Sequence, residues 1–246
     1  MTRRPRLLDL FCGEGGAGRG FQLAGFDVTG VDLAKRCASR YPGRFIRGDA
    51  VKFAVDHAGD FDAVHASPPC KVHTSLAVLH PEDTAGMLFP MATHVDLIPD
   101  TRAALVASGR PWIIENVPGA PLIDPVTLCG SMFGLGAVCE DGWRQLWRHR
   151  LFESTARLIA PGPCQHDGSP VGVYGNGGGG LDAATRGYKA TQQEANEALQ
   201  TPWMSRTGVS QAIPPAYTEW LGAQLLDQLG NEKTPEPMGV GSGVVQ

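Results

Sequence analysis

The sequence has no pair of closely spaced cysteines, no long apolar segment and no excess of positive charge. Its six cysteines, at positions 12, 37, 70, 129, 139 and 164, are scattered, which does not indicate a disulfide framework. Without an apolar segment of membrane-spanning length, we expect a cytoplasmic protein with reduced thiols and no membrane partner. A formal charge of −4 argues against a protein that coats nucleic acid indiscriminately, because such binding sums many Lys and Arg contacts to phosphate.

A glycine-rich loop follows the first apolar run of the chain. Residues 6–12 have strand character, residues 13–18 are rich in glycine, and residues 19–24 have helical character. This order of strand, loop and helix brings backbone N–H groups and a helix N-terminus close to a ligand. The length of 246 residues allows the loop to belong to one large domain, with or without a small appendage.

Acidic residues follow the next two predicted strands. The apolar run 26–31 ends at Asp32, and the run 44–47 is followed by Gly48 and Asp49. In a nucleotide-type βαβ unit, an acid about 20 residues beyond the glycine loop accepts hydrogen bonds from ribose hydroxyls. Repeated strand and helix segments predict an α/β fold, in which ligands bind at the carboxyl edge of the parallel sheet.

A cysteine follows the fourth predicted strand. Residues 61–66 lead into Ser67-Pro68-Pro69 and then Cys70, so the thiol stands after two positions of fixed φ. Cys70 is either a held nucleophile or a small buried side chain after a turn. The fifth predicted strand, 112–114, places Glu115 at the same edge of the sheet.

Other segments carry weaker signals. Residues 71–90 read as a mobile loop and potential lid, 91–108 as a helix, 217–229 as a closing helix, and the tail after Gly230 as disordered. The basic run formed by Arg144, Arg148, His149, Arg150 and Arg157 is by default a solvated surface. Cys129, Cys139, Cys164 and His166 are candidate zinc ligands, but the lack of a Cys-x-x-Cys pair favours structural cysteines and no metal.

Several of these segments, taken in order, resemble the successive motifs of the DNA (cytosine-5)-methyltransferases. The matching residues are Asp9-Leu10-Phe11-Cys12-Gly13-Glu14-Gly15-Gly16, Asp32, Gly48-Asp49, Ser67-Pro68-Pro69-Cys70, Glu115-Asn116-Val117, Gln145 with Arg148-His149-Arg150, and Gln211-Ala212-Ile213-Pro214-Pro215-Ala216-Tyr217. The resemblance implies a Rossmann-like α/β sheet of the S-adenosylmethionine-dependent methyltransferases, with helices on both faces and a small irregular recognition region. It also implies a catalytic domain at 1–150, a recognition region or linker at 151–189, a segment at 190–230 that completes the catalytic domain, and a disordered tail at 231–246.

The resemblance further implies roles for individual residues in transfer of a methyl group from S-adenosyl-L-methionine to cytosine in DNA. The implied catalytic residues are Cys70, Glu115, Arg148 and Arg150. The implied cofactor-binding residues are Phe11, Gly13, Gly15, Gly16, Asp32, Asp49, Pro68 and Gln211. The implied DNA-binding residues are Ser67, Pro69, Lys71, His73, Thr74, Asn116 and Gln145.

Three departures from the family pattern keep alternatives open. Lys71 stands where glutamine is usual, Ser210-Gln211 stand where Gly-Asn is usual, and 151–189 is short for a recognition domain. Lys71 would contact phosphate, lower the pKa of Cys70, or pair with a carboxylate on an altered donor such as carboxy-S-adenosylmethionine. The short region admits a free cytosine nucleotide or RNA as substrate, or an inactive DNA-binding homologue. We expect a monomer, with a recognition partner as an alternative.

Overall fold

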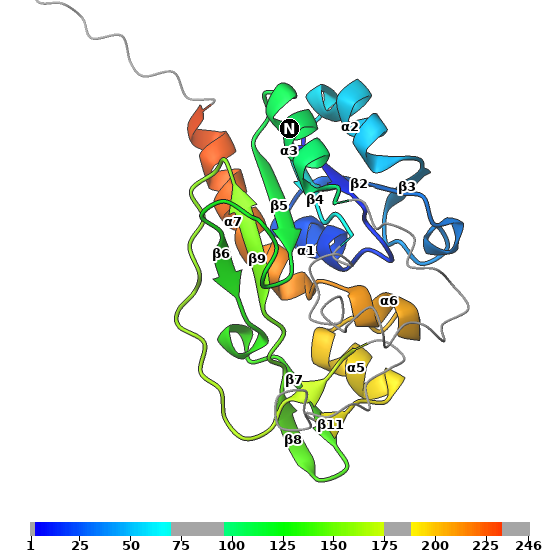
Figure 1. The fold of residues 1–246 in the computed structure, drawn as a ribbon, viewed down its shortest axis with the longest axis vertical. Coiled ribbons are helices and arrows are strands. Elements are labelled where there is room, and N and C mark those ends of the chain that lie inside the picture. The colour runs from blue at the N-terminus through cyan, green and yellow to red at the C-terminus, as the bar shows by residue number, and fades with distance from the viewer. Residues whose placement is uncertain (1–2, 70–95, 175–187, 233–246) are drawn as a thin grey trace, which may run out of the picture.

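Seven strands form the central sheet of the computed structural model, which describes residues 3–69, 96–174 and 188–232 (Figure 1). Their spatial order is β3-β2-β1-β4-β5-β9-β6. Strands β1 to β5 pair in parallel, whereas β9 is antiparallel to both β5 and β6. The strands are β1 Arg6–Leu10, β2 Asp27–Asp32, β3 Arg44–Arg47, β4 Ala63–Ala66, β5 Trp112–Asn116, β6 Val126–Leu128 and β9 Arg150–Ser154.

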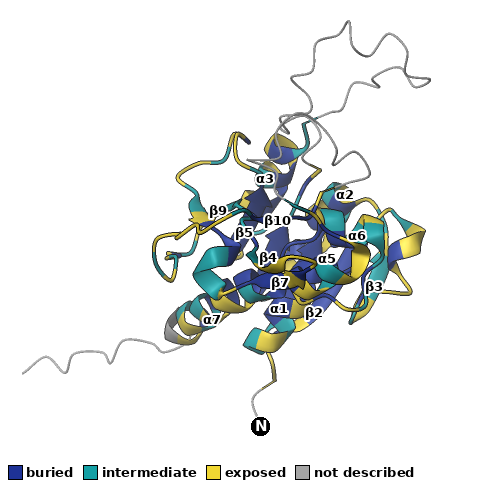
Figure 2. Cartoon of the chain, turned by 90° about the horizontal axis from the view of Figure 1, so that it is seen from below, coloured by how far each residue is buried: buried dark blue, intermediate teal, exposed yellow. Residues whose placement is uncertain are grey.

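Helices cover both faces of this sheet, so its central strands β1, β4 and β5 are buried on both sides. Helices α1 (Gly16–Ala24) and α7 (Pro215–Glu232) pack together on one face, and α2 (Ala50–His57) packs with α3 (Ile98–Ala107) on the other. Successive side chains of β1 therefore enter different cores: Leu7 joins the first, and Leu8 joins the second. Figure 2 shows β4 and β5 in the buried interior. The predicted α/β fold with helices on both faces is confirmed.

The helix boundaries follow local chemistry. Helix α1 begins after Gly15, whose φ of 86° lies in the left-handed region. The Asp49 carboxylate accepts a hydrogen bond from Lys52 N and caps α2. Helices α1 and α7 contain the predicted helical segments 19–24 and 217–229, and α7 starts earlier and ends later than predicted. Helix α3 lies within the predicted 91–108, whose first five residues are outside the described part of the chain.

Smaller elements lie at one end of the molecule. They include the antiparallel hairpin of β7 (Gly136–Cys139) and β8 (Gly142–Gln145), the parallel pair of β10 (Val171–Gly172) and β11 (Tyr188–Lys189), and helices α5 (Gln192–Leu199) and α6 (Arg206–Gln211). Short 3-10 turns occur at η1 (Lys35–Cys37), η2 (Ala58–Asp60) and η5 (Gly130–Phe133). Strand β9 extends the central sheet to Ser154, four residues beyond the predicted domain boundary at 150. Within the described ranges, no helix is both long and apolar enough to cross a membrane.

Candidate active site

The strand order reverses between β1 and β4, which marks the crevice where ligands bind in open α/β sheets. The glycine-rich loop follows β1, and Ser67-Pro68-Pro69 follow β4, so both motifs meet at this point. Asp32, Asp49 and Glu115 stand at the carboxyl ends of β2, β3 and β5 or just beyond them. Cys70, Lys71, His73 and Thr74, the lid segment 71–90 and the glycine run 175–180 lie outside the described residues.

The loop after β1 has a left-handed backbone at three positions. Phe11 has φ 56°, Gly13 has φ 52° and Gly15 has φ 86°. Phe11 adopts this conformation despite its side chain, and such strain concentrates at ligand-binding sites. A Cβ placed on Gly13 would meet nothing within 4 Å, whereas one on Gly15 would lie 2.3 Å from Pro42 Cδ and one on Gly16 would lie 2.3 Å from the Ile213 carbonyl oxygen. Gly13 therefore borders open space, while Gly15 and Gly16 permit close packing.

The two acids predicted to bind a cofactor have different local partners. Asp32 accepts hydrogen bonds from Gly13 N at 3.0 Å and from Ala34 N at 2.8 Å, which fixes its half-buried carboxylate beside the glycine loop. Asp49 Oδ1 accepts from Lys52 N at 3.0 Å as the cap of α2. The glycine loop thus orients Asp32, which was predicted to bind the same ligand as that loop. Asp49 caps α2 whether or not it also contacts a ligand.

The residues before Cys70 are anchored to both neighbouring strands. Ser67 N donates to the Leu10 carbonyl at 3.2 Å, and Ser67 Oγ donates to the Phe11 carbonyl at 3.4 Å. On the other side, Asn116 Nδ2 donates to the Pro68 carbonyl at 3.0 Å. Pro68 is buried and Pro69 is exposed. The backbone that leads to Cys70 is therefore held between the glycine loop and the end of β5, and Asn116 and Ser67 hold it through internal bonds.

Glu115 and Arg150 form an ion pair across β5 and β9. Arg150 Nε lies 3.0 Å from Glu115 Oε1, and the two side chains are 15% and 7% exposed. The pair places a cation against a carboxylate that has little access to water. Burial raises the pKa of Glu115, and the positive charge of Arg150 opposes this rise. Among the described residues, Glu115 Oε1 has no correctly oriented hydrogen-bond donor, so the contact with Arg150 is electrostatic.

Arg148 is directed into the protein. Its Nε, Nη1 and Nη2 donate to the backbone carbonyls of Ala212, Val173 and Ser210, each at 2.8 Å. The side chain is buried, and that burial lowers its pKa. The default interpretation of the basic run as a solvated surface is therefore wrong for Arg148, because its guanidinium satisfies backbone carbonyls of the closing segment. No feature of the sequence distinguishes Arg148 from its neighbours in this respect.

A buried polar network joins β1 to β4 and to Tyr41, and the sequence analysis did not predict it. Asp9 Oδ1 lies 2.8 Å from His65 Nδ1, and Tyr41 Oη donates to Asp9 Oδ2 at 3.0 Å. Near the loop itself, the Glu14 carboxylate accepts from Ser205 N at 2.7 Å and from Ser205 Oγ at 2.6 Å. An acid inside an apolar run, as at Asp9, was the one available signal. These contacts fix the glycine loop from below and from the C-terminal segment.

Two glutamines predicted at the site have other surroundings. Gln145 Oε1 accepts hydrogen bonds from Trp147 Nε1 and from Asp167 N, both at 3.0 Å. Gln211 is exposed at the end of α6. The DNA-binding role of Gln145 and the cofactor role of Gln211 remain predictions, and the geometry gives Gln145 an internal bracing role.

No family model matches this sequence, and no curated protein does so either. Solved structures nevertheless share its fold. A protein of an E. coli prophage described as a DNA modification methyltransferase aligns with a TM-score of 0.55 and 13% identity, covering 92% of this chain and 99% of that one. The S. pombe Dnmt2 methyltransferase gives 0.57 and 11%, with the same coverages. The Entamoeba histolytica methyltransferase EhMeth gives 0.55 and 11%, covering 93% and 99%. The chain therefore has the α/β fold of these methyltransferases.

Proposed function

We propose that this protein transfers a methyl group from S-adenosylmethionine to carbon-5 of cytosine in DNA, with Cys70 as a covalent nucleophile. The observation that carries the proposal is the buried Glu115–Arg150 pair, which adjoins the anchored backbone leading to Cys70. A carboxyl group with a raised pKa, beside a fixed cation, matches the need to protonate and hold a pyrimidine ring as a nucleophile adds to it. The fold shared with a DNA modification methyltransferase supports the same assignment.

The residues at the β1–β4 crevice fit S-adenosylmethionine. Gly13 borders open space beside a left-handed turn, and Asp32 is fixed next to it with acceptor capacity for ribose hydroxyls. Phe11 supplies an aromatic group near the same loop, which suits a sulfonium. Asp49 would accept from the adenine amine with the oxygen that does not cap α2. When bound, the cofactor would supply an electrophilic methyl group.

The chain's own residues would activate the cytosine. The Cys70 thiolate adds to carbon-6, which makes carbon-5 nucleophilic enough to accept the methyl group. Protonated Glu115 donates to ring N3 as negative charge develops, and Arg150 stabilises that charge from the side. After transfer, a base removes the carbon-5 proton, the C6–S bond breaks to return the thiolate, and ring N3 gives its proton back to Glu115. Arg148 acts as a positioning residue, because most of its N–H groups hold backbone carbonyls.

A cytosine in duplex DNA must leave the base stack to reach this site. Lys71, His73 and Thr74 follow the nucleophile in sequence, and we propose that they contact phosphate as the base enters. The region 151–189 offers few side chains to reach base edges, so the recognised context should be about two to four bases. Bisulfite sequencing of a treated plasmid measures this context, and strict modification of a longer site would contradict it.

Covalent trapping tests the proposed chemistry directly. With an oligonucleotide that contains 5-fluorocytosine, we expect an adduct that persists in denaturing gels, because fluorine cannot leave as the carbon-5 proton does. Cys70→Ala should abolish the adduct, and Glu115→Gln should slow its formation by about 10²–10⁴-fold, the usual contribution of a general acid. A folded wild-type protein that forms no adduct with the cofactor present would refute the assignment and support the inactive homologue.

Three further comparisons separate the remaining alternatives. Equal turnover of deoxycytidine monophosphate and of an oligonucleotide would move the substrate class to free nucleotides, and preference for an RNA oligonucleotide would move it to RNA. Incubation with carboxy-S-adenosylmethionine, followed by mass spectrometry of the nucleoside, tests the altered donor suggested by Lys71. Transfer of methyl alone would exclude that donor.

A further inference from the structure

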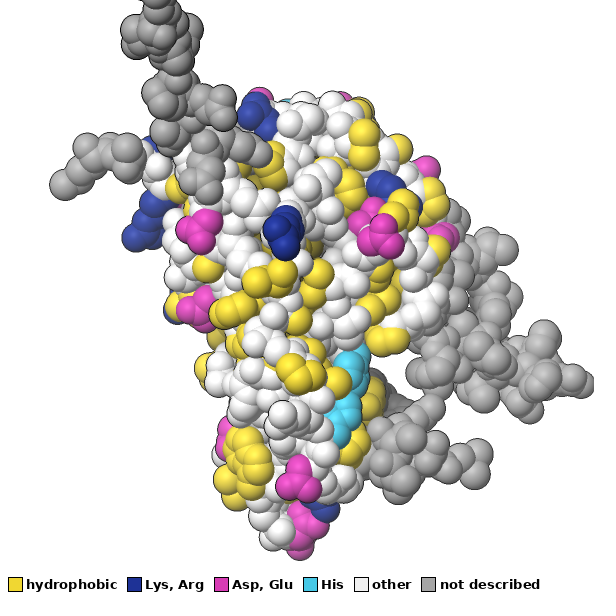
Figure 3. Space-filling view, turned by 90° about the vertical axis from the view of Figure 1, so that its left-hand side faces the viewer, with side chains coloured by type: hydrophobic (Ala, Val, Ile, Leu, Met, Phe, Trp, Pro, Cys, Tyr) yellow, Lys and Arg dark blue, Asp and Glu magenta, His cyan; other side chains and the backbone are white. Residues whose placement is uncertain are grey.

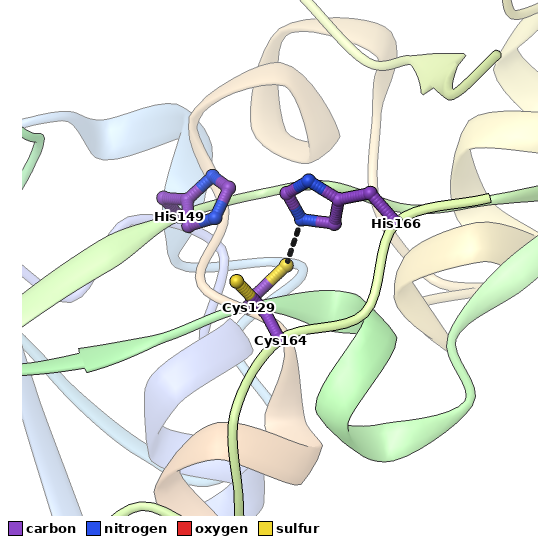
Figure 4. Close-up of side chains that lie close together, drawn as sticks. All are labelled: Cys129, His149, Cys164 and His166. Atoms are coloured by element: carbon purple, nitrogen blue, oxygen red, sulfur yellow. Dashed lines mark hydrogen bonds between the residues drawn. The ribbon is translucent and has the colours of Figure 1, made fainter. Parts of the chain in front are cut away.

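Two cysteines and two histidines converge next to the segment that carries Arg148 and Arg150 (Figure 4). One ligand atom from each of Cys129, His149, Cys164 and His166 lies within 4.8 Å of the others. Cys129 Sγ is already 3.3 Å from His166 Nε2. Cys139, which the sequence analysis grouped with these residues, is not among them, because its buried thiol points to the Ala137 carbonyl.

We propose that Cys129, His149, Cys164 and His166 bind one Zn²⁺ ion in a closed structural site. Two thiolates and two imidazoles form the ligand set that zinc prefers in tetrahedral coordination. Bonds of about 2.3 Å to sulfur and 2.0–2.1 Å to nitrogen give edges of about 3.3–3.8 Å between ligand atoms, so contraction by about 1 Å completes the tetrahedron. Because protein ligands fill all four positions, the ion would hold structure and would not activate water.

The four ligands come from three separate stretches of chain. Cys129 directly follows β6, His149 lies between β8 and β9, and Cys164 and His166 lie in the irregular segment that follows β9. The stretch 161–168 is almost wholly exposed and forms no helix or strand. Such a stretch has little apolar surface to bury, so a metal ion would provide the energy that orders it.

Neighbouring side chains contact the four candidate ligands and orient them, as they do in zinc sites. Ser131 Oγ donates to Cys129 Sγ at 3.3 Å and accepts from Gln165 N at 3.2 Å, which places a donor on the thiolate and ties down the residue between the other two ligands. The Trp147 ring stacks on His166 at 4.3 Å between centroids and fixes the imidazole plane. Structural cysteines scattered by chance would not require this set of supports.

The position of the site explains what it would stabilise. His149 is flanked in sequence by Arg148 and Arg150, so an ion bound to it would fix the start of β9 against β6. Access for the ion is open, because Cys164 and His166 are exposed and histidine side chains reach the surface beside the β7–β8 end of the molecule in Figure 3. The site would thus brace the start of β9, where Arg150 lies, and the residues just before it, which include Arg148.

Metal analysis of the full-length protein tests this proposal independently of methyl transfer. We expect one zinc per chain after purification without added metal and exhaustive dialysis. Cobalt(II) substitution should give intense d–d bands of tetrahedral geometry and sulfur-to-cobalt charge-transfer bands. Cys164→Ala, at an exposed position, should lower the affinity for zinc more than 100-fold, and Ser131→Ala should lower it about 10–100-fold.

Cys139→Ala is the matched control, because it also removes one thiol but lies outside the cluster. It should retain one zinc and the cobalt spectrum. Since Cys139 is buried and Cys164 is exposed, misfolding would affect the control more than the test variant. Absence of zinc in the wild type, a disulfide between Cys129 and Cys164 in the freshly purified protein, or equal zinc content in Cys164→Ala would overturn the proposal.

Discussion

Arg148 and Arg150 are separated by one residue, yet their replacement by methionine should affect stability very differently. The Arg148 guanidinium donates three hydrogen bonds to backbone carbonyls. At about 1.5–3 kcal/mol for each bond from a charged donor, these contribute about 5–9 kcal/mol. Desolvation of the buried cation offsets several kcal/mol of that gain. Arg148→Met should therefore lower the free energy of unfolding by about 3–5 kcal/mol and leave three carbonyls without their donor.

Arg150→Met should cost less, because its partner can adapt. The pKa of Glu115 is already raised, so this carboxyl takes up a proton when the cation is removed and avoids a buried unpaired charge. We expect a loss of about 1–2 kcal/mol, equivalent to about one pKa unit of differential interaction. The backbone carbonyls that accept hydrogen bonds from Arg148 cannot be neutralised by taking up a proton in this way.

Urea unfolding followed by tryptophan fluorescence and by circular dichroism distinguishes the two variants. With a slope of about 2 kcal/mol/M, Arg148→Met should lower the midpoint by about 2 M and Arg150→Met by less than about 1 M. Covalent trapping should show the opposite order, with Arg150→Met more impaired per folded molecule. Equal losses of stability, or a larger loss for Arg150→Met, would refute the assignment of Arg148 to positioning and Arg150 to the carboxylate.

Other substitutions probe separate parts of the same frame. Between the ordinary pKa of glutamate and the raised pKa of native Glu115, the native state holds a proton that the unfolded chain has released, so wild-type stability falls as pH rises. Glu115→Gln cannot titrate, so its free energy of unfolding relative to wild type should rise with pH across this range. Urea titrations at several pH values measure this difference, and a difference that does not change with pH would contradict the prediction. Tyr217→Phe removes the 2.5 Å hydrogen bond to the Arg148 carbonyl and should cost about 1–2 kcal/mol in urea unfolding, whereas no change would show that the bond contributes little. Gly13→Ala should lower the free energy of unfolding by about 1 kcal/mol, because Gly13 has a positive φ. Gly16→Ala should lower it by about 1–3 kcal/mol more, because the added Cβ would meet the Ile213 carbonyl oxygen. A reversed order of the two variants in thermal unfolding would contradict this prediction.

The parallel half of the sheet was predictable because most of its strands are buried on both faces. The runs that became β1, β2, β4 and β5 are rich in apolar residues, and each is followed by a glycine, acidic or proline signal. The antiparallel half was not predicted. Strand β9, for example, contains the charged residues Arg150 and Glu153, which interrupt its apolar pattern and pair with Glu115 and Arg102.

The candidate site divides in the same way. Local motifs indicated the glycine loop, Asp32 and Glu115, because each stands at the end of an apolar run and the sheet brings such ends together. The role of Arg148 depends on contacts between distant segments, and no local pattern encodes it. The same holds for the cluster formed by Cys129, His149, Cys164 and His166. A short Cys-x-His pair at 164–166 was the one visible trace of that grouping.

The glycine loop and the helix after it are anchored by residues that the ribosome adds near the end of synthesis. Glu14 is held by Ser205, 191 positions later, and the Ala17 carbonyl accepts from Thr218, 201 positions later. At about 5–20 residues per second, the ribosome needs about 10–40 s to add Ser205 after Glu14. During that interval the nascent chain contains the first strands and the glycine loop but not the residues that form these hydrogen bonds. The glycine loop therefore becomes fully anchored late in synthesis, and chains released early would lack these contacts.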